Sequence, residues 1–200
     1  MNITVEPADG AAGLSLRPWT TRDVPALLAA HRDPALRRWL TTRLESEVDA
    51  YRWVEQQHEA WSAGTFFSFA VTETGADATS ALEPDHPIGS VVLKIAPDSS
   101  RPGAASEVGY WTAPEARGKG VAPRALDAVT RWAFGSQTLT VPGRLELLHA
   151  AANDGSCRVA QKSGYTFHST LPPFPPDYPG EGHLHVRVDE PRIRACRCMS

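Results

Sequence analysis

The stretch EVGYWTAPEARGKGVA, residues 107–122, decides the fold prediction for this chain. Its first part is strand-like, and its second part opens a long amphipathic helix. Gly118 and Gly120 remove side chains where the first N–H groups of that helix have no partner within the helix. Those N–H groups, the helix dipole and the positive charges of Arg117 and Lys119 together favour an anion. We therefore predict that this turn binds a phosphate or pyrophosphate group of a small molecule.

Two common phosphate-binding motifs do not fit this turn. A Walker loop needs Gly-Lys followed by Ser or Thr, but Lys119 is followed by Gly120. A dinucleotide fingerprint needs a third glycine and an acidic residue about 20 positions further on. The short string by itself also leaves open a glycine-rich helix cap that binds no ligand.

Strand-like runs and amphipathic stretches extend outward from this turn in both directions. They predict an α/β fold with helices on the faces of a mixed, mostly antiparallel sheet. The element order is β α α β β β α β α β β, over residues 14–17, 20–28, 47–63, 66–72, 88–95, 104–111, 120–134, 144–150, 156–163, 165–171 and 182–188. We expect a flexible arm over residues 1–13, one domain over 14–188 and a tail over 189–200.

Composition and charge exclude several classes of protein. The chain has 200 residues, of which 42% are apolar and 22% charged, so it is globular rather than disordered. The net charge of -3 provides no basic face for nucleic acid. The densest apolar run, residues 66–71, is far shorter than the about 20 residues that cross a bilayer, so no membrane partner is expected. Three cysteines and no N-terminal signal pattern favour a reducing cytoplasm.

Residues 117–122 resemble the acyl-CoA-binding signature of the GNAT superfamily of N-acetyltransferases. That signature is Arg or Gln, two residues, Gly, one residue, then Gly or Ala, and every position is satisfied. Other stretches are similar to the RimJ/RimL branch, which acetylates protein N-terminal amines. They are Leu16-Arg17-Pro18, Asp33-Pro34 with Trp39-Leu40, Glu107-Val108-Gly109-Tyr110-Trp111, Asn153-Asp154-Gly155-Ser156 and Val159 to Tyr165. The resemblance covers roughly residues 14–188 and implies a GNAT-type sheet.

The resemblance also implies acetyl-CoA as the co-substrate, with no metal. The backbone amides of Gly118, Gly120 and Val121 would hold its pyrophosphate. Pro123 departs from the family pattern, but a proline in the first turn of a helix removes one orphan donor and is tolerated. The full set of cofactor-binding residues expected from the resemblance is Tyr110, Trp111, Thr112, Arg117, Gly118, Lys119, Gly120, Val121, Ala122, Asn153 and Ser156.

Two residues are the candidate catalytic groups for direct attack of an amine on the thioester in a ternary complex. Glu107 is the candidate base, and its alternative role is an ion pair across the sheet. Ser156 is the candidate donor to the leaving thiolate, and its alternative role is the N-cap of its helix. An α-amino group has a pKa of about 7.7–8.0, so a strong base is not essential.

Cysteine and histidine residues suggest other chemistry, which we do not favour. Cys157 could be a nucleophile, but no partner is identifiable, and a small buried apolar role is expected. His149 shares a strand face with leucines and is expected to pack in the sheet. Cys196-Arg197-Cys198 with His183 and His185 matches no common zinc signature, so a basic tail is the preferred interpretation.

The acceptor is an amine whose identity the motifs leave undefined. A protein or peptide N-terminus is the first choice, an aminoglycoside or polyamine is the enzymatic alternative, and a non-catalytic acyl-CoA sensor is the other. The acyl chain length and a homodimer also stay open. Asp177 and Glu181 either attract a cationic amine or form a solvated loop face.

Prolines are concentrated near the end of the chain. Five of the 17 prolines lie between Leu171 and Gly180. Such a run favours stiff, extended backbone. Pro172 to Pro179 is either a rigid surface connector or, with Phe174 and Tyr178, a wall of the acceptor site.

Overall fold

The computed structural model describes residues 1–8, 10–75, 85–97, 104–136, 139, 141, 143–176 and 178–189. Two short 3-10 turns, η1 (Thr21–Asp23) and η2 (Pro114–Ala116), accompany the helices and strands. The helices and strands are, in chain order, β1 (Ile3–Val5), β2 (Gly13–Pro18), α1 (Val24–Arg32), α2 (Pro34–Trp39), α3 (Glu47–Ser62), β3 (Phe66–Thr74), β4 (Pro87–Lys94), β5 (Ser106–Thr112), α4 (Val121–Gly135), β6 (Arg144–Ala150), α5 (Asp154–Lys162), β7 (Thr166–Leu171) and β8 (Gly182–Val188).

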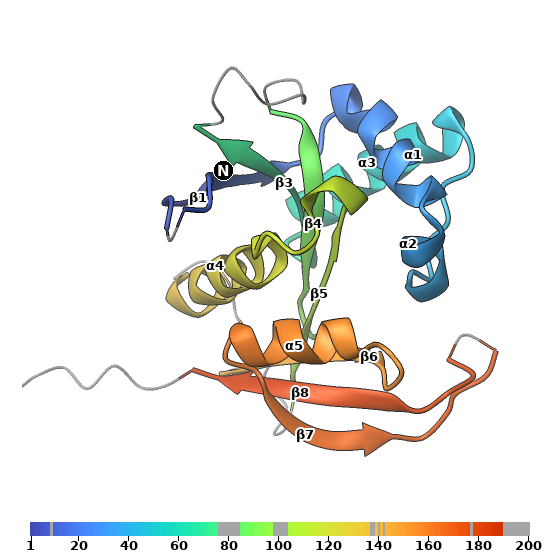
Figure 1. Ribbon diagram of the computed structural model, residues 1–200, viewed down its shortest axis with the longest axis vertical. Coiled ribbons are helices and arrows are strands. Elements are labelled where there is room, and N and C mark those ends of the chain that lie inside the picture. Colours follow the sequence, from blue (N-terminus) through green and yellow to red (C-terminus); the bar gives the residue numbers. More distant parts are fainter. Residues whose placement is uncertain are drawn as a thin grey trace, which may run out of the picture.

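The strands form one sheet in the order β1-β2-β3-β4-β5-β6-β8-β7 (Figure 1). Among the described strands, β5 and β6 pair in parallel and every other neighbouring pair is antiparallel. This confirms the mixed, mostly antiparallel α/β sheet that the sequence predicts. No helix in the described part of the chain is long and apolar enough to cross a bilayer.

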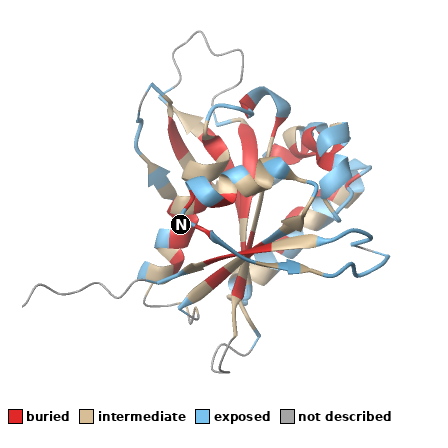
Figure 2. Cartoon of the chain, turned by 60° about the horizontal axis from the view of Figure 1, so that its bottom comes forward, coloured by how far each residue is buried: buried red, intermediate tan, exposed pale blue. Residues whose placement is uncertain are grey.

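Alternation along β3 gives the sheet two apolar faces. Phe69 and Val71 point into the larger core, which α4 covers, whereas Ala70 points into a second core beneath α1 and α3. Trp19 is fully buried in that second core. Figure 2 shows the buried residues concentrated in the central strands and on the inner sides of the helices. The site described below therefore rests on a sheet that is held from both faces.

The N-terminal segment differs from the expected flexible arm. Ile3 to Val5 forms β1, which pairs antiparallel with β2, and Ile3 and Val5 pack against the core beside α4. Arg124 of α4 also donates to the backbone oxygens of Glu6 (2.9 Å) and Ala12 (2.8 Å). Three residues are too few for the apolar–polar alternation of a strand to be recognised, so the sequence analysis did not predict β1.

A third helix before β3 is the other difference in the element order. Asp33 ends α1 and caps α2, where its carboxylate accepts from the N–H groups of Ala35 (3.4 Å) and Leu36 (3.2 Å). Pro34 then begins α2, because proline suits the first turn of a helix. The expected tail over 189–200 lies outside the described residues after Asp189.

Candidate functional site

The parallel pair β5–β6 opens after a short ladder. Its pairs run from Ser106–Leu145 to Val108–Leu147, although β5 continues to Thr112 and β6 to Ala150. Beyond the ladder, β4 holds the outer edge of β5 and β8 holds the outer edge of β6. The inner edges of residues 109–112 and 148–150 are therefore not paired with each other. An unpaired strand edge can bind an extended ligand through main-chain hydrogen bonds.

The glycine-rich turn lies between β5 and α4 and exposes backbone N–H groups. Gly118 (φ +77°) and Gly120 (φ +73°) adopt the left-handed conformation, and Gly120 is the N-cap of α4. A Cβ at either glycine would meet no atom within 4 Å, so the space in front of the turn is open. Among the described residues, the N–H groups of 118–122 donate no backbone hydrogen bond of good geometry. Free donors therefore gather at the positive end of the helix dipole.

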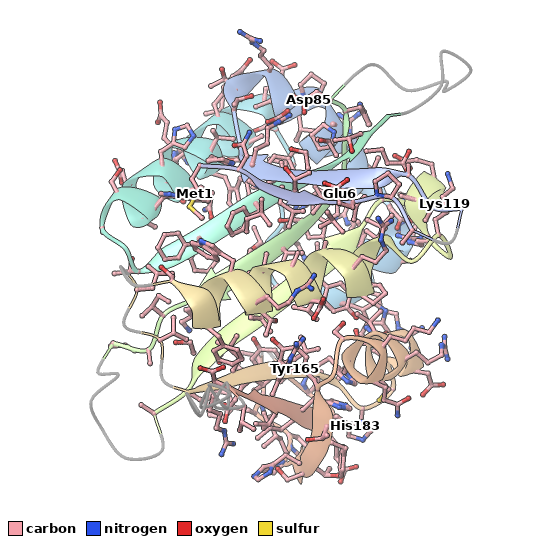
Figure 3. The ribbon with its side chains drawn as sticks, turned by 90° about the vertical axis from the view of Figure 1, so that its left-hand side faces the viewer. Met1, Glu6, Asp85, Lys119, Tyr165 and His183 are labelled. Atoms are coloured by element: carbon pink, nitrogen blue, oxygen red, sulfur yellow. The ribbon has the colours of Figure 1, made fainter. Side chains whose placement is uncertain are left out.

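The two basic residues of this turn have different partners. The guanidinium of Arg117 pairs with the Asp33 carboxylate, and its Nε donates to the Thr112 oxygen (3.3 Å). Burial acts to raise the pKa of Asp33, but its bonds from Arg117 and the α2 backbone outweigh burial and lower it. Lys119 is exposed and forms no ion pair with the described residues (Figure 3). Lys119 thus supplies the uncompensated charge, whereas Arg117 ties the turn to β5 and α2.

Tyr110 and Ser156 connect β5 to α5 across the opened pair. The Tyr110 hydroxyl donates to Ser156 Oγ (2.9 Å), and burial raises the pKa of Tyr110 to about 12. The N-cap of α5 is Asn153, whose Oδ1 accepts from the Ser156 N–H (3.2 Å). The alternative role of Ser156 as N-cap is therefore wrong, and the carboxamide oxygen of Asn153 is already engaged. Because Ser156 Oγ accepts from Tyr110, its own proton remains available to another group.

Glu107 lies near the start of β5, where the ladder to β6 is still closed. Its carboxylate pairs with Lys94 Nζ across the sheet (3.3 Å), and its side chain is 45% exposed. Such exposed ion pairs contribute at most about 1 kcal/mol to stability, so the pair with Lys94 leaves the Glu107 carboxylate available for another role. Alternation places Glu107 and Trp111 on the face of α1 and α3, opposite Tyr110. Trp111 packs there against Trp19, with ring centres 6.0 Å apart.

Four side chains that the sequence analysis treated separately meet beneath α5. Sγ of Cys157 lies 3.3 Å from His183 Nδ1, 3.6 Å from His149 Nε2 and 3.8 Å from His185 Nε2. Cys157 therefore has polar partners that the sequence does not identify, and His149 contacts the Cys157 sulfur as well as packing in the sheet. The signal available in the sequence is the alternation of His183 and His185, which places both imidazoles on one face of a strand. Cys196 and Cys198 lie outside the described residues.

A parallel pair that opens beside free N–H groups at a helix N-terminus can hold an extended ligand that carries an anionic group. The chain belongs to the GNAT acetyltransferase family, because residues 14–166 match the family model described as Acetyltransferase (GNAT) domain. The family, the enzyme class and acetyl-CoA as the co-substrate of that class are thus confirmed. No curated protein sequence matches the chain significantly.

Solved structures share this fold at low sequence identity. RimL, a ribosomal L7/L12 alpha-N-protein acetyltransferase in complex with coenzyme A, has a TM-score of 0.73 and 18% identity, covering 93% of this chain and 98% of its own. Mycobacterium smegmatis RimJ in complex with CoA-disulfide has a TM-score of 0.72 and 18% identity, covering 94% and 87%. The microcin C7 self immunity acetyltransferase MccE, in complex with acetyl-CoA and AMP, has a TM-score of 0.71 and 14% identity, covering 88% and 92%.

Proposed function

We propose that this enzyme transfers an acetyl group from acetyl-CoA to a protein or peptide N-terminal amine by direct attack in a ternary complex. The observation that carries the proposal is the end of the β5–β6 ladder beside the free N–H groups of residues 118–122. The pyrophosphate of acetyl-CoA would lie at the N-terminus of α4, and its pantetheine arm would run along the unpaired edges of β5 and β6. The likeness to RimL and RimJ supports the choice of acceptor.

The cofactor side of the site is formed mainly by backbone. The N–H groups of Gly118, Gly120 and Val121 would bind the pyrophosphate, and Lys119 would compensate its charge. The open space in front of both glycines fits this role, because no side chain there blocks a bulky anion. The inner edge of residues 109–112 would hydrogen-bond the amides of the arm. The thioester itself supplies the acetyl group.

Residues from both faces of the sheet would handle the protons. Glu107 would accept the proton of the attacking amine, directly or through water, from the face of α1 and α3. Because up to about half of the α-amino groups are already neutral at cellular pH, the rate gained from proton removal by Glu107 is modest. Ser156, whose Oγ accepts from Tyr110, would donate its hydroxyl proton to the departing sulfur. The amine nitrogen forms the new bond to the carbonyl carbon as the carbon–sulfur bond breaks, without an acyl-enzyme.

A panel of amines tests the acceptor. The purified protein is given acetyl-CoA with a peptide, the same peptide with a blocked N-terminus, spermidine and an aminoglycoside, and free thiol is measured. We expect thiol release with the unblocked peptide and none with the blocked one. Release with spermidine or the aminoglycoside alone would replace the proposed acceptor by a small amine. Coenzyme A binding without release from any amine would identify a sensor.

A glycine substitution tests the pyrophosphate site. Gly120→Glu places a carboxylate in the open space before the N–H groups, and we expect at least about a tenfold loss of coenzyme A affinity, equal to about 1.4 kcal/mol. Gly120→Ala separates the strain of the left-handed backbone from the effect of charge. Gly135→Glu, at the other end of α4 and also with open space, is the matched control. Unchanged affinity in Gly120→Glu would refute the site.

A further inference from the structure

Three secondary-structure elements contribute to the cluster beneath α5. His149 on β6 pairs in register with His183 on β8, and His185 lies two residues further along β8 on the same face. α5 crosses that face and places Cys157 one turn after its cap. Figure 3 shows His183 in the lower part of the molecule, near α5. One potential ligand atom from each residue lies within 4.8 Å of all the others.

These distances match the shell of a tetrahedral metal ion. Zinc binds sulfur at about 2.3 Å and imidazole nitrogen at about 2.0–2.1 Å, so tetrahedral edges are about 3.6 Å between sulfur and nitrogen and about 3.4 Å between nitrogens. The observed distances from Cys157 Sγ to the three ring nitrogens are 3.3, 3.6 and 3.8 Å. The sulfur is therefore already placed, and the nitrogens need to close in by less than about 1.5 Å.

Surrounding contacts orient the rings for binding. Nδ1 of His149 donates to the Ala150 oxygen (2.8 Å), which leaves the lone pair of Nε2 directed at the sulfur. Phe167 packs edge-on against His183 and His185, with ring centres 5.2 and 5.7 Å away. A carbonyl partner and an apolar cover are usual around histidine metal ligands.

We propose that His149, Cys157, His183 and His185 bind a divalent transition-metal ion, with zinc as the first choice. Thiolate and imidazole ligands favour zinc and similar ions over magnesium or calcium. Four protein ligands complete the tetrahedron and leave no open position, so the ion is structural. It joins β6, β8 and α5, whose first turn carries Ser156. The proposal does not depend on acyl transfer and is tested without it.

Metal content of the untagged 200-residue chain is the first measurement. The protein is depleted with a chelator, given zinc, separated from free ion and analysed by mass spectrometry for zinc. We expect one zinc ion per chain. Cobalt(II) in place of zinc should give a thiolate-to-cobalt charge-transfer band and the intense visible bands of a tetrahedral site. The absence of both zinc retention and the thiolate band would overturn the proposal.

Ligand variants locate the ion. Cys157→Ser and His183→Ala should each lower zinc affinity at least about tenfold. Removing a residue that only hydrogen-bonds a metal ligand already lowers metal affinity by about 10–100-fold, so removing a ligand should cost at least as much. His168→Ala is the matched control, because His168 is exposed on the same β7–β8 hairpin. The double variant Cys196→Ser/Cys198→Ser should retain zinc. Retention in Cys157→Ser with loss in the double variant would place the ion elsewhere and overturn the proposal.

The wild-type chain provides a test that does not depend on the folding of a variant. Zinc should protect Cys157 from alkylation, measured by mass spectrometry on its own peptide, and should raise the thermal midpoint. Equal alkylation of Cys157 with and without zinc would contradict binding through its sulfur.

Discussion

Arg117 and Lys119 stand two positions apart in one turn, yet contacts with distant residues give them different roles. Arg117 meets Asp33 and the Thr112 oxygen, so its charge is balanced before any ligand binds. Lys119 faces solvent and forms no ion pair in the described part of the chain. Two cations in the same turn therefore have different partners and different roles.

This difference gives a prediction from salt dependence. Lys119→Ala should weaken coenzyme A binding and reduce the dependence of affinity on salt concentration, because a screened charge interaction is lost. Arg117→Ala should weaken binding but leave the salt dependence unchanged, because it releases the turn from β5 and α2. Titration calorimetry at three salt concentrations measures both. A reduced salt dependence in Arg117→Ala would mean that its guanidinium contacts the pyrophosphate.

Arg17 and Asp23 form an ion pair whose contribution to stability depends on pH. The Asp23 side chain is 4% exposed and accepts from Arg17 (2.8 Å) and from the Thr20 N–H (2.7 Å). Burial acts to raise the pKa of Asp23, but these bonds prevail and lower it. The carboxylate thus contributes stability that is present above its unfolded pKa of about 3.9 and is lost as pH falls through the lower folded pKa.

Asp23→Asn should therefore destabilise the protein at neutral pH by about 1–3 kcal/mol, because Arg17 loses a charged hydrogen-bond partner but keeps its ion pair with Asp85 (2.9 Å). The variant should also lose less stability than the wild type between pH 5 and pH 3. Urea unfolding at several pH values measures both effects. Parallel pH profiles for the two proteins would show that Asp23 does not carry this dependence.

Among the strands, β1 shows that a three-residue edge can belong to the core. Its side chains alternate, so Ile3 and Val5 pack toward α4 while Thr4 is exposed. Arg124 adds backbone contacts that draw the following segment onto α4. The edge is therefore held by a helix as well as by β2.

Substitution within β1 tests this arrangement. Ile3→Ala with Val5→Ala should lower the free energy of unfolding by about 1–2 kcal/mol, less than full burial would give because both side chains are half-buried. Thr4→Ala, on the exposed side of the same strand, should change it by no more than about 0.5 kcal/mol. Denaturant unfolding measures all three substitutions. An equal effect at Thr4 would show that packing on α4 is not the cause.

At the scale of the whole molecule, the loop between β7 and β8 lies toward the same side as the helices α1 and α2 (Figure 1). Phe174 and Tyr178 bond to each other through their backbones (2.7 and 2.9 Å) and remain 70% and 58% exposed. Asp177 lies outside the described residues. The loop thus presents two aromatic side chains to solvent.

This placement predicts that the loop serves the acceptor rather than the cofactor. Replacing Pro172 to Pro179 by a short Gly-Ser turn should raise the KM for the acceptor peptide more than the Kd for coenzyme A. The double variant Phe174→Ser/Tyr178→Ser keeps the backbone of the loop and should also raise the KM for the peptide more than the Kd for coenzyme A. Steady-state kinetics and calorimetry provide the two constants. Equal losses in both would rule out a wall of the acceptor site.

Local patterns in the chain determined the sheet class, the long helix and the glycine turn, because strand alternation, helix periodicity and left-handed glycines depend on neighbours in sequence. Tertiary structure decided the partners: Arg117 with Asp33, Ser156 with Tyr110, and Cys157 with three histidines. These contacts join residues far apart in the chain, and strand register and helix placement set them. A family signature therefore predicts a cofactor turn, whereas a metal cluster built from three elements emerges only when β6, β8 and α5 pack together.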